Sequence, residues 1–226
     1  MDAVVDVLER PLYTMSQVDR LLGLPHGTAR RWIDGYSRRG RDYRPIVRET
    51  PTGADVVTWG EFVETRLLSE FRDAGVPILN MRPAIEALRA QTDSRYPLAH
   101  SASLLTPMGK ELVKRIQDEV HLDRELQLVV VRNGQYMLTP PAELYVNAMQ
   151  FDDDGAAVRM LPDPEYPQVL IDPARAFGEP AVRSVPTEVI AEQVRAGDPE
   201  ELVAELYDLP LEHVRAAVRF EQRHSA

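Results

Sequence analysis

Two short helical segments between residues 14 and 36, separated by a glycine-containing turn, restrict the fold of this sequence more than any other feature. The first segment places three apolar side chains on one helical face: Val18, Leu21 and Leu22. Thr14 or Ser16 can cap this helix, and Thr28 can cap the second one. Helices this short bury their apolar faces by crossing each other at the turn, so the sequence predicts a helix-turn-helix in which the first helix supports the second.

The charge of the chain is concentrated around this helix pair. The 226 residues include 26 Lys and Arg against 36 Asp and Glu, a net charge of −10, and such a balance alone argues against nucleic-acid binding. Between Arg20 and Arg48, however, eight arginines stand against two acids. This window therefore carries +6 and the remainder of the chain −16, which indicates an anion-binding surface on an otherwise acidic protein.

We interpret the basic window as a DNA-binding surface, with a solvated charged face as the alternative. Arginine donates to phosphate oxygens and to guanine edges in the major groove. The segment 37–57 is rich in Arg, Pro and Gly, and its β-prone pieces at 46–47 and 56–57 predict a two-stranded wing. The ring of Tyr36 could belong either to the core or to a phosphate contact. The residues expected at the DNA are Thr28, Arg30, Arg31, Tyr36, Arg38, Arg39 and Arg41.

Further short elements follow the wing. A capping box at Thr58 and Glu61 predicts a helix that ends at Gly75. We interpret Glu61, Glu64 and Asp73 as part of its solvated face. Additional helices are expected over 76–90 (bent at Pro83), 106–120, 140–150, 187–196, 199–206 and 211–223. A buried strand is expected over 126–131, and hairpin turns are expected at Asn133-Gly134 and Asp154-Gly155.

These elements predict an α+β fold that is mostly helical. We divide the chain into three parts: an N-terminal winged helix-turn-helix domain over 1–92, an α/β middle region with short hairpins over 93–167, and a C-terminal three-helix, helix-turn-helix-like module over 168–226.

Several classes of protein are excluded by what the sequence lacks. There is no cysteine, and therefore no disulfide, thiolate nucleophile or cysteine-bound metal. The five histidines show no zinc-ligand spacing, and the acids at 152–154 fit a hairpin tip better than a calcium loop. No apolar stretch is long enough to span a membrane, and no secretory signal begins the chain. We therefore expect a cytoplasmic protein that is not an enzyme, uses no cofactor and does not enter a membrane.

The C-terminal module is acidic where a second DNA-binding helix pair would be basic. Between residues 186 and 212 eight acids accompany a single arginine, Arg195. DNA would be repelled by this surface, which suits a basic protein partner or solubility alone. The module also carries more apolar residues than three short helices can easily bury, which indicates a dimer interface.

Two resemblances to known families agree with this division. Residues Tyr13 to Leu88 resemble the MerR-like winged helix-turn-helix, and the motifs that carry the resemblance are Tyr13–Leu24, Thr28–Trp32, Phe62–Ala74 and Gly75–Pro77. The long C-terminal coiled coil and the cysteine loop of metal-responsive MerR regulators are absent. The last 55 residues or so are similar to a small domain of VapB-type antitoxins, through 171–173, 177–182, 185–187, 196–202 and 211–217.

The combined resemblance implies a type II antitoxin. Such a protein represses its own operon as a homodimer on operator DNA and neutralises a PIN-like ribonuclease toxin by direct binding. The candidate toxin-binding residues are Arg175, Arg183, Arg219 and Arg223, which could cap the carboxylates of the toxin's active site. The alternatives are a MerR-like transcriptional regulator with an unidentified effector and no toxin, or a scaffold protein without a DNA role.

Overall fold

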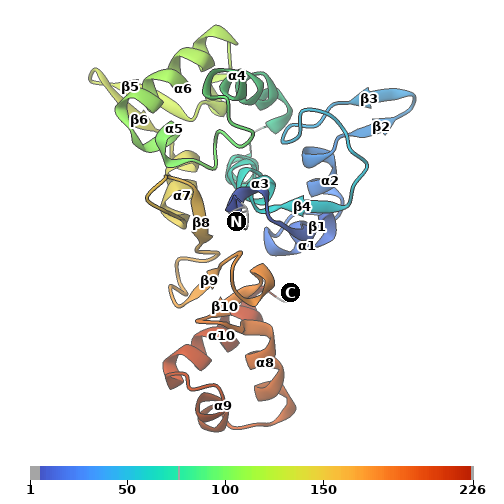
Figure 1. Ribbon diagram of the computed structural model, residues 1–226, viewed down its shortest axis with the longest axis vertical. Helices are drawn as coiled ribbons and strands as arrows, with labels where there is room; N and C mark the ends of the chain where they lie inside the picture. Colours follow the sequence, from blue (N-terminus) through green and yellow to red (C-terminus); the bar gives the residue numbers. More distant parts are fainter. Residues whose placement is uncertain (1–5, 76, 225–226) are drawn as a thin grey trace, which may run out of the picture. The chain divides into compact units, whose positions relative to one another are not determined.

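A computed structural model describes residues 6–75 and 77–224 (Figure 1). Contacts divide the chain into two compact units. The first comprises Met1–Asn147 and Phe151–Ala157, and the second comprises Ala148–Gln150 and Val158–Ala226. The predicted middle region, 93–167, is thus shared between the two units, and most of it belongs with the helix-turn-helix. The predicted α+β, mostly helical fold class is confirmed.

The helix-turn-helix begins with a strand and a capped helix. Strand β1 (Pro11–Thr14) pairs antiparallel with β4 (Val56–Thr58). Helix α1 (Met15–Leu21) starts with a capping box in which Thr14 and Gln17 exchange hydrogen bonds, so Thr14 is the cap rather than Ser16. Helix α2 (Thr28–Ile33) is capped at Gly27, whose φ of 77° is left-handed. The prediction that Thr28 caps α2 is therefore wrong by one residue.

The wing differs from the predicted one. Its strands are β2 (Tyr36–Arg38) and β3 (Arg41–Tyr43), which pair antiparallel around a tight turn. Ile46 and Val47 are buried without forming a strand, because their amides donate to the Trp32 carbonyl oxygen at the end of α2, at 2.7 and 3.0 Å. The predicted partner at 56–57 forms β4, which pairs with β1 instead.

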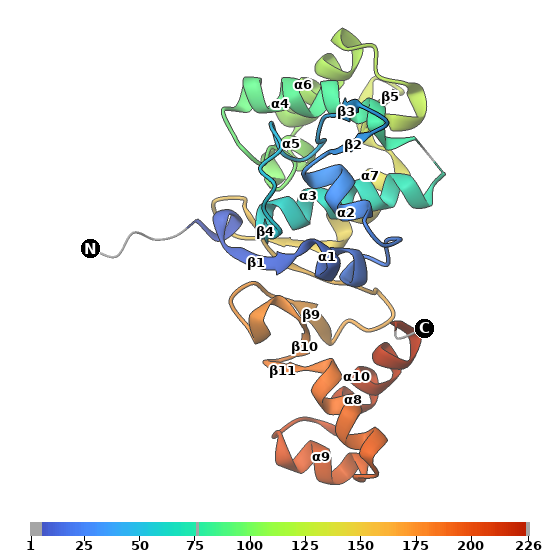
Figure 2. The ribbon, with the colours of Figure 1, turned by 90° about the vertical axis from the view of Figure 1, so that its right-hand side faces the viewer.

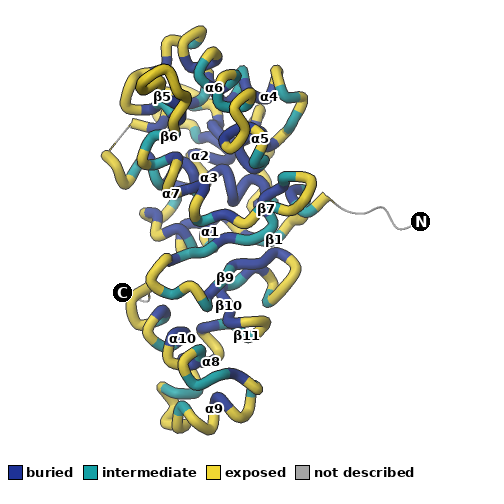
Figure 3. The backbone as a smooth tube through the Cα atoms, turned by 90° about the vertical axis from the view of Figure 1, so that its left-hand side faces the viewer, coloured by how far each residue is buried: buried dark blue, intermediate teal, exposed yellow. Residues whose placement is uncertain are grey.

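The core of the first unit surrounds one long helix. Helix α3 (Trp59–Asp73) begins with the predicted capping box and is buried along most of its length (Figure 3). The indole nitrogen of Trp59 donates to the Ala157 carbonyl oxygen at 2.6 Å. A 3-10 turn (Ile78–Met81) precedes α4 (Arg82–Thr92), so Pro83 lies in the first turn of a helix rather than at a bend. Around these elements lie α5 (Ser101–Leu105), α6 (Pro107–Glu119) and α7 (Pro140–Ala148).

The predicted Asn-Gly hairpin joins β5 (Val129–Arg132) to β6 (Gln135–Leu138). Both turn residues are left-handed, with φ of 51° at Asn133 and 75° at Gly134, as this kind of turn requires. The predicted buried strand over 126–131 is only partly correct. A 3-10 turn occupies Arg124–Leu126, the strand starts at Val129, and Val131 is half exposed.

Strands and helices together form the second unit. Its five-stranded sheet has the order β11-β10-β9-β8-β7 and is formed by β7 (Met149–Phe151), β8 (Ala157–Met160), β9 (Val169–Ile171), β10 (Pro180–Val182) and β11 (Val185–Pro186). The predicted hairpin turn around Asp154-Gly155 lies between β7 and β8. The three predicted helices are confirmed within one or two residues as α8 (Thr187–Ala196), α9 (Glu200–Leu206) and α10 (Leu211–His224).

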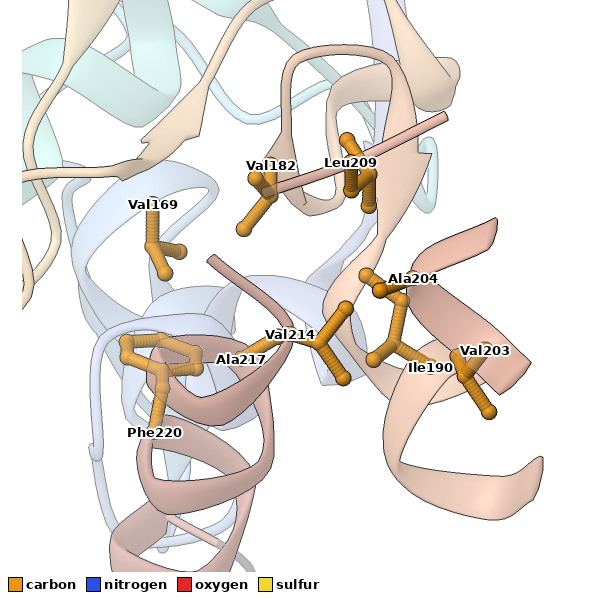
Figure 4. Close-up of a cluster of buried hydrophobic side chains, with 9 residues drawn as sticks. All are labelled: Val169, Val182, Ile190, Val203, Ala204, Leu209, Val214, Ala217 and Phe220. Carbon is orange, nitrogen blue, oxygen red and sulfur yellow. The ribbon is translucent and has the colours of Figure 1, made fainter. Parts of the chain in front are cut away.

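The sheet buries most of the apolar residues that the three helices of this unit could not bury by themselves. Val169 and Val182 from β9 and β10 pack with Ile190, Val214 and Phe220 from the helices in one buried cluster (Figure 4). Of the apolar side chains that suggested a dimer interface, only three are exposed: Val189, Leu202 and Leu206. The surplus is therefore mostly buried within the unit and gives little support for a dimer.

None of the helices within 6–75 and 77–224 has the length and apolar character needed to cross a membrane.

A buried acid in α3 makes the stability of the first unit dependent on pH. The side chain of Glu64 is 1% exposed, its Oε2 lies 3.2 Å from Nη2 of Arg89, and its Oε1 accepts the Leu98 N–H at 3.1 Å. Burial, which the guanidinium offsets only in part, raises the pKa of Glu64 to about 7.

We expect the free energy of unfolding to fall as the pH rises from 4.5 to about 7, because folded Glu64 keeps a proton that the unfolded chain has released. The titration of one such group changes the free energy of unfolding by at most about 1.4 kcal/mol per pH unit. Glu64→Gln cannot bind this proton and should remove that contribution. Urea unfolding of both proteins across this interval tests the prediction, and parallel profiles would contradict it.

Candidate nucleic-acid interface

A buried acid fixes the turn between α1 and α2. Asp19 on α1 is 5% exposed, and its carboxylate accepts hydrogen bonds from Gly27 N at 2.6 Å and from Ala29 N at 2.7 Å. Because these amides belong to the start of α2, Asp19 caps that helix from a distance. The two amides are consequently unavailable to a phosphate group.

This arrangement changes the role expected for Thr28. Thr28 is 4% exposed, and its hydroxyl oxygen accepts a hydrogen bond from Nη2 of Arg31 at 2.8 Å. Thr28 therefore supports Arg31 instead of presenting its hydroxyl to a ligand.

Helix α2 has one buried face and one arginine face. Ala29, Trp32 and Ile33 are buried, while Arg30 and Arg31 are exposed. Nη2 of Arg30 lies 2.6 Å from Oδ1 of Asp55, and both side chains are about half exposed. Ion pairs this exposed stabilise little and are screened by salt, so Arg30 can exchange Asp55 for a phosphate at small cost.

The wing gathers three further arginines at its tip. Arg38 and Arg41 face each other as a strand pair, and Arg39 and Gly40 form the turn with φ of 51° and 76°. Like charges opposite one another destabilise a hairpin unless an anion lies between them. Within the described part of the chain, neither Arg38 nor Arg39 has an ion pair.

Two stacked tyrosines stiffen the wing. The rings of Tyr36 and Tyr43 lie 4.5 Å apart and within 4° of parallel, and the guanidinium of Arg41 lies 5.4 Å from the Tyr43 ring. Tyr36 is only partly buried, so its ring belongs to the wing rather than to the core.

Arg48, which was counted in the basic window, is not a surface residue. Its Nε and Nη2 donate to the two carboxylate oxygens of Glu61 at 2.7 and 3.0 Å, and its Nη1 donates to Oδ1 of Asp34 at 2.8 Å. Thr52 and two backbone carbonyls accept further bonds from the same guanidinium. All three charged side chains are buried. Because Arg48 and Asp34 leave the surface together, the remaining seven arginines and Asp42 of the window still carry +6.

The Asp34–Arg48 pair closes the base of the wing. Asp34 follows α2 and precedes the wing, and Arg48 comes after it. Burial raises the pKa of Asp34, but hydrogen bonds from Thr52, Arg48 and Gly53 outweigh this effect and hold the pKa below its usual value. A charged, multiply bonded Asp34 thus holds the wing against α2.

The interpretation of Glu61 and Glu64 as solvated residues is wrong. Glu61 pairs with Arg48 and Glu64 with Arg89, and all four side chains are buried. The sequence signal that could have revealed Glu61 is its place in the capping box, because a capping glutamate already lies against the backbone. Asp73, by contrast, is exposed as predicted.

The candidate toxin-binding arginines lie in the second unit, whereas the helix-turn-helix residues belong to the first. Arg175 and Arg183 lie on two different loops of the sheet, and Arg219 and Arg223 lie one turn apart on α10. Arg175 lies 3.6 Å from Asp172, and Arg183 donates to the Asp208 carbonyl at 3.4 Å. Arg223 pairs with Asp163 and Glu165.

No group of three or more acidic or histidine side chains converges as a metal site in the part of the chain that the structure describes. Asp152 shapes a turn, since its carboxylate accepts the Ala156 N–H at 2.8 Å.

Comparisons with known proteins find one family match near each end of the chain. Residues 11–85 match the family described as "Putative DNA-binding HTH domain", which confirms the predicted helix-turn-helix. Residues 169–220 match the family described as "Protein of unknown function (DUF433)". The fold is similar to the crystal structure of Rv2018 from Mycobacterium tuberculosis, with a TM-score of 0.75 and 27% identity, over 94% of this chain and 100% of that one.

Two relatives from Mycobacterium tuberculosis (strain ATCC 25618 / H37Rv) match nearly the whole chain. The uncharacterized protein Rv2308 is 40% identical over 228 residues, which cover 98% of this chain and 94% of that protein. The protein named "Putative antitoxin VapB45" is 30% identical over 225 residues, which cover 92% of each. The chain therefore belongs to the family that includes Rv2308 and the protein named "Putative antitoxin VapB45".

Proposed function

We propose that this protein is the antitoxin of a type II toxin–antitoxin pair. It represses its own operon by binding operator DNA, and it neutralises a PIN-like ribonuclease toxin by direct contact. The observation that carries the proposal is the arginine face of α2 and the wing, in a chain that is 30% identical to a relative named as an antitoxin over 92% of both.

The DNA-binding half of the proposal follows the MerR-like arrangement. Helix α2 enters the major groove with Arg30 and Arg31, and the wing tip places Arg38, Arg39 and Arg41 against the flanking backbone. The proposal includes a homodimer, in which the two copies of α2 lie on the two half-sites of a palindromic operator.

The toxin-binding half of the proposal belongs to the second unit. Between residues 186 and 212 its eight acids and single arginine exclude a second DNA contact and leave a surface for protein. The proposed toxin-binding residues remain Arg175, Arg183, Arg219 and Arg223.

Co-expression with the protein encoded by the neighbouring gene tests this function. We expect a stable complex whose ribonuclease activity is silent and appears when this subunit is removed. A neighbouring protein that neither binds nor cleaves RNA would overturn the antitoxin function and favour a MerR-like regulator that responds to an unidentified effector.

A further inference from the structure

The aromatic side chain of Phe177 is almost entirely exposed to solvent. It lies in the segment that joins β9 to β10 in the second unit (Figure 2), and it is 89% exposed. No other large apolar side chain of the described residues is more exposed. An exposed phenylalanine gains nothing from burial within its own chain.

The backbone around Phe177 is strained. Ala176, Phe177 and Gly178 have consecutive positive φ angles of 47°, 54° and 75°. Only the third of these residues is a glycine, and side-chain-bearing residues are destabilised in the left-handed region. The chain thus adopts an unfavourable conformation at the very residue whose side chain finds no partner.

The segment is nevertheless closed by hydrogen bonds of its own, so the strain is not a sign of a loose loop. Asp172, which is buried, accepts the Ala174 N–H through its carboxylate at 2.8 Å and the Arg175 N–H through its backbone oxygen at 3.0 Å. Gly178 N donates to the Arg175 carbonyl at 2.9 Å. Residues held in the left-handed region cluster at functional sites.

The charges of the unit indicate what kind of partner covers Phe177. Half-exposed guanidinium groups of Arg159 and Arg175 lie 2.8 and 3.6 Å from Oδ2 of Asp172, at the base of the segment. The acids of α8 and α9 repel nucleic acid, and they disfavour a second copy of the same unit. A different protein, with an apolar pocket for the aromatic side chain and basic side chains opposite these acids, fits this unit.

We propose that Phe177 is the anchor by which this protein holds its toxin, filling an apolar pocket on the toxin's surface. The inference rests on the proposed antitoxin function and assigns the centre of its protein interface to the β9–β10 segment. Arg175, predicted from the sequence to contact the toxin, then lies at the edge of the same contact.

Phe177→Gly tests the proposal, because it removes the aromatic ring and relieves the strained backbone at once. We expect the affinity of the full-length chain for the neighbouring gene's product to fall by roughly thirty-fold or more, as for a central interface residue. The melting temperature of the free protein should stay the same or rise. Titration calorimetry and thermal unfolding measure the two quantities.

Three matched variants separate the ring from its surroundings. Ala176→Gly relieves the neighbouring strain and keeps Phe177, so it should bind as the wild type does. Met108→Ala removes another highly exposed apolar side chain, which lies on α6 in the first unit and outside the proposed protein interface, and should also bind normally. Phe177→Asn, which tolerates the left-handed conformation, should lose affinity as Phe177→Gly does.

The outcomes distinguish this inference from the function on which it rests. A wild-type complex that is unaffected by either Phe177 variant would overturn the anchor and leave the antitoxin function standing. Lower melting temperatures in both Phe177 variants would assign the residue to folding and also overturn it. A wild type that binds no neighbouring product would overturn both proposals.

Discussion

Reversing two charges together, Arg30→Glu and Arg31→Glu, should lower the affinity for operator DNA by at least about a hundredfold. Both side chains lie on the exposed face of α2, and each arginine contact to a base or phosphate is worth roughly 1–3 kcal/mol. The buried face of α2 is untouched, so the fold should persist. Fluorescence anisotropy on the protein's own promoter fragment, at fixed ionic strength, measures the loss.

A control variant with the same change in net charge distinguishes the effect of a specific DNA-binding surface from the effect of the protein's overall charge. Arg115→Glu with Arg124→Glu makes the same change on α6 and its following turn, in the same unit. This variant should bind the promoter almost as well as the wild type. Equal losses in the two double variants would contradict the assignment of α2, and a loss of toxin binding in the α2 variant would contradict separate DNA and toxin surfaces.

The sequence predicts those parts of the fold that depend on neighbouring residues. The capping box at Thr58 begins α3, and the Asn133-Gly134 turn joins two strands. Each signal acts within about four residues, through a cap or a backbone conformation that few residue types adopt. Such signals need no knowledge of what packs against the element.

The buried charge network could not be predicted in this way. Glu61 and Arg48 are 13 residues apart, and Glu64 and Arg89 are 25 apart, so no helical or strand period links them. An acid on a helix usually lies in water, and its spacing does not tell which face the rest of the chain covers. For the same reason the β-prone segments at 46–47 and 56–57 gave the wrong wing, since their partners are the end of α2 and β1.

The sequence predicts the exposed arginines of the candidate interface, but it does not predict the acids that hold its elements in place. The exposed arginines of α2 and the wing follow from charge and turn chemistry along the sequence. Asp19, Asp34 and Asp55, which cap, brace and pair with these elements, could not be identified because each acts on a residue eight or more positions away.

Replacing Arg48 by methionine should destabilise the first unit by about 3–5 kcal/mol, the effect of removing one partner from a buried ion pair. Methionine fills a similar space, but it leaves the carboxylates of Asp34 and Glu61 buried without their shared guanidinium. The base of the wing should loosen as well, because the Asp34–Arg48 bond is what closes it. Urea unfolding measures the loss of stability, and hydrogen exchange of the 36–43 amides measures the loosening.

Arg44→Met is the matched control, because Arg44 is 65% exposed and pairs with Glu86 at 3.2 Å on the surface. The substitution Arg44→Met should lower the free energy of unfolding by at most about 1 kcal/mol. Restoring neutrality in the Arg48→Met background with Asp34→Asn and Glu61→Gln should recover part of the stability, because no unpaired charge then remains buried. Equal effects of Arg44→Met and Arg48→Met, or no recovery in the triple variant, would show that buried charge does not hold the wing in place.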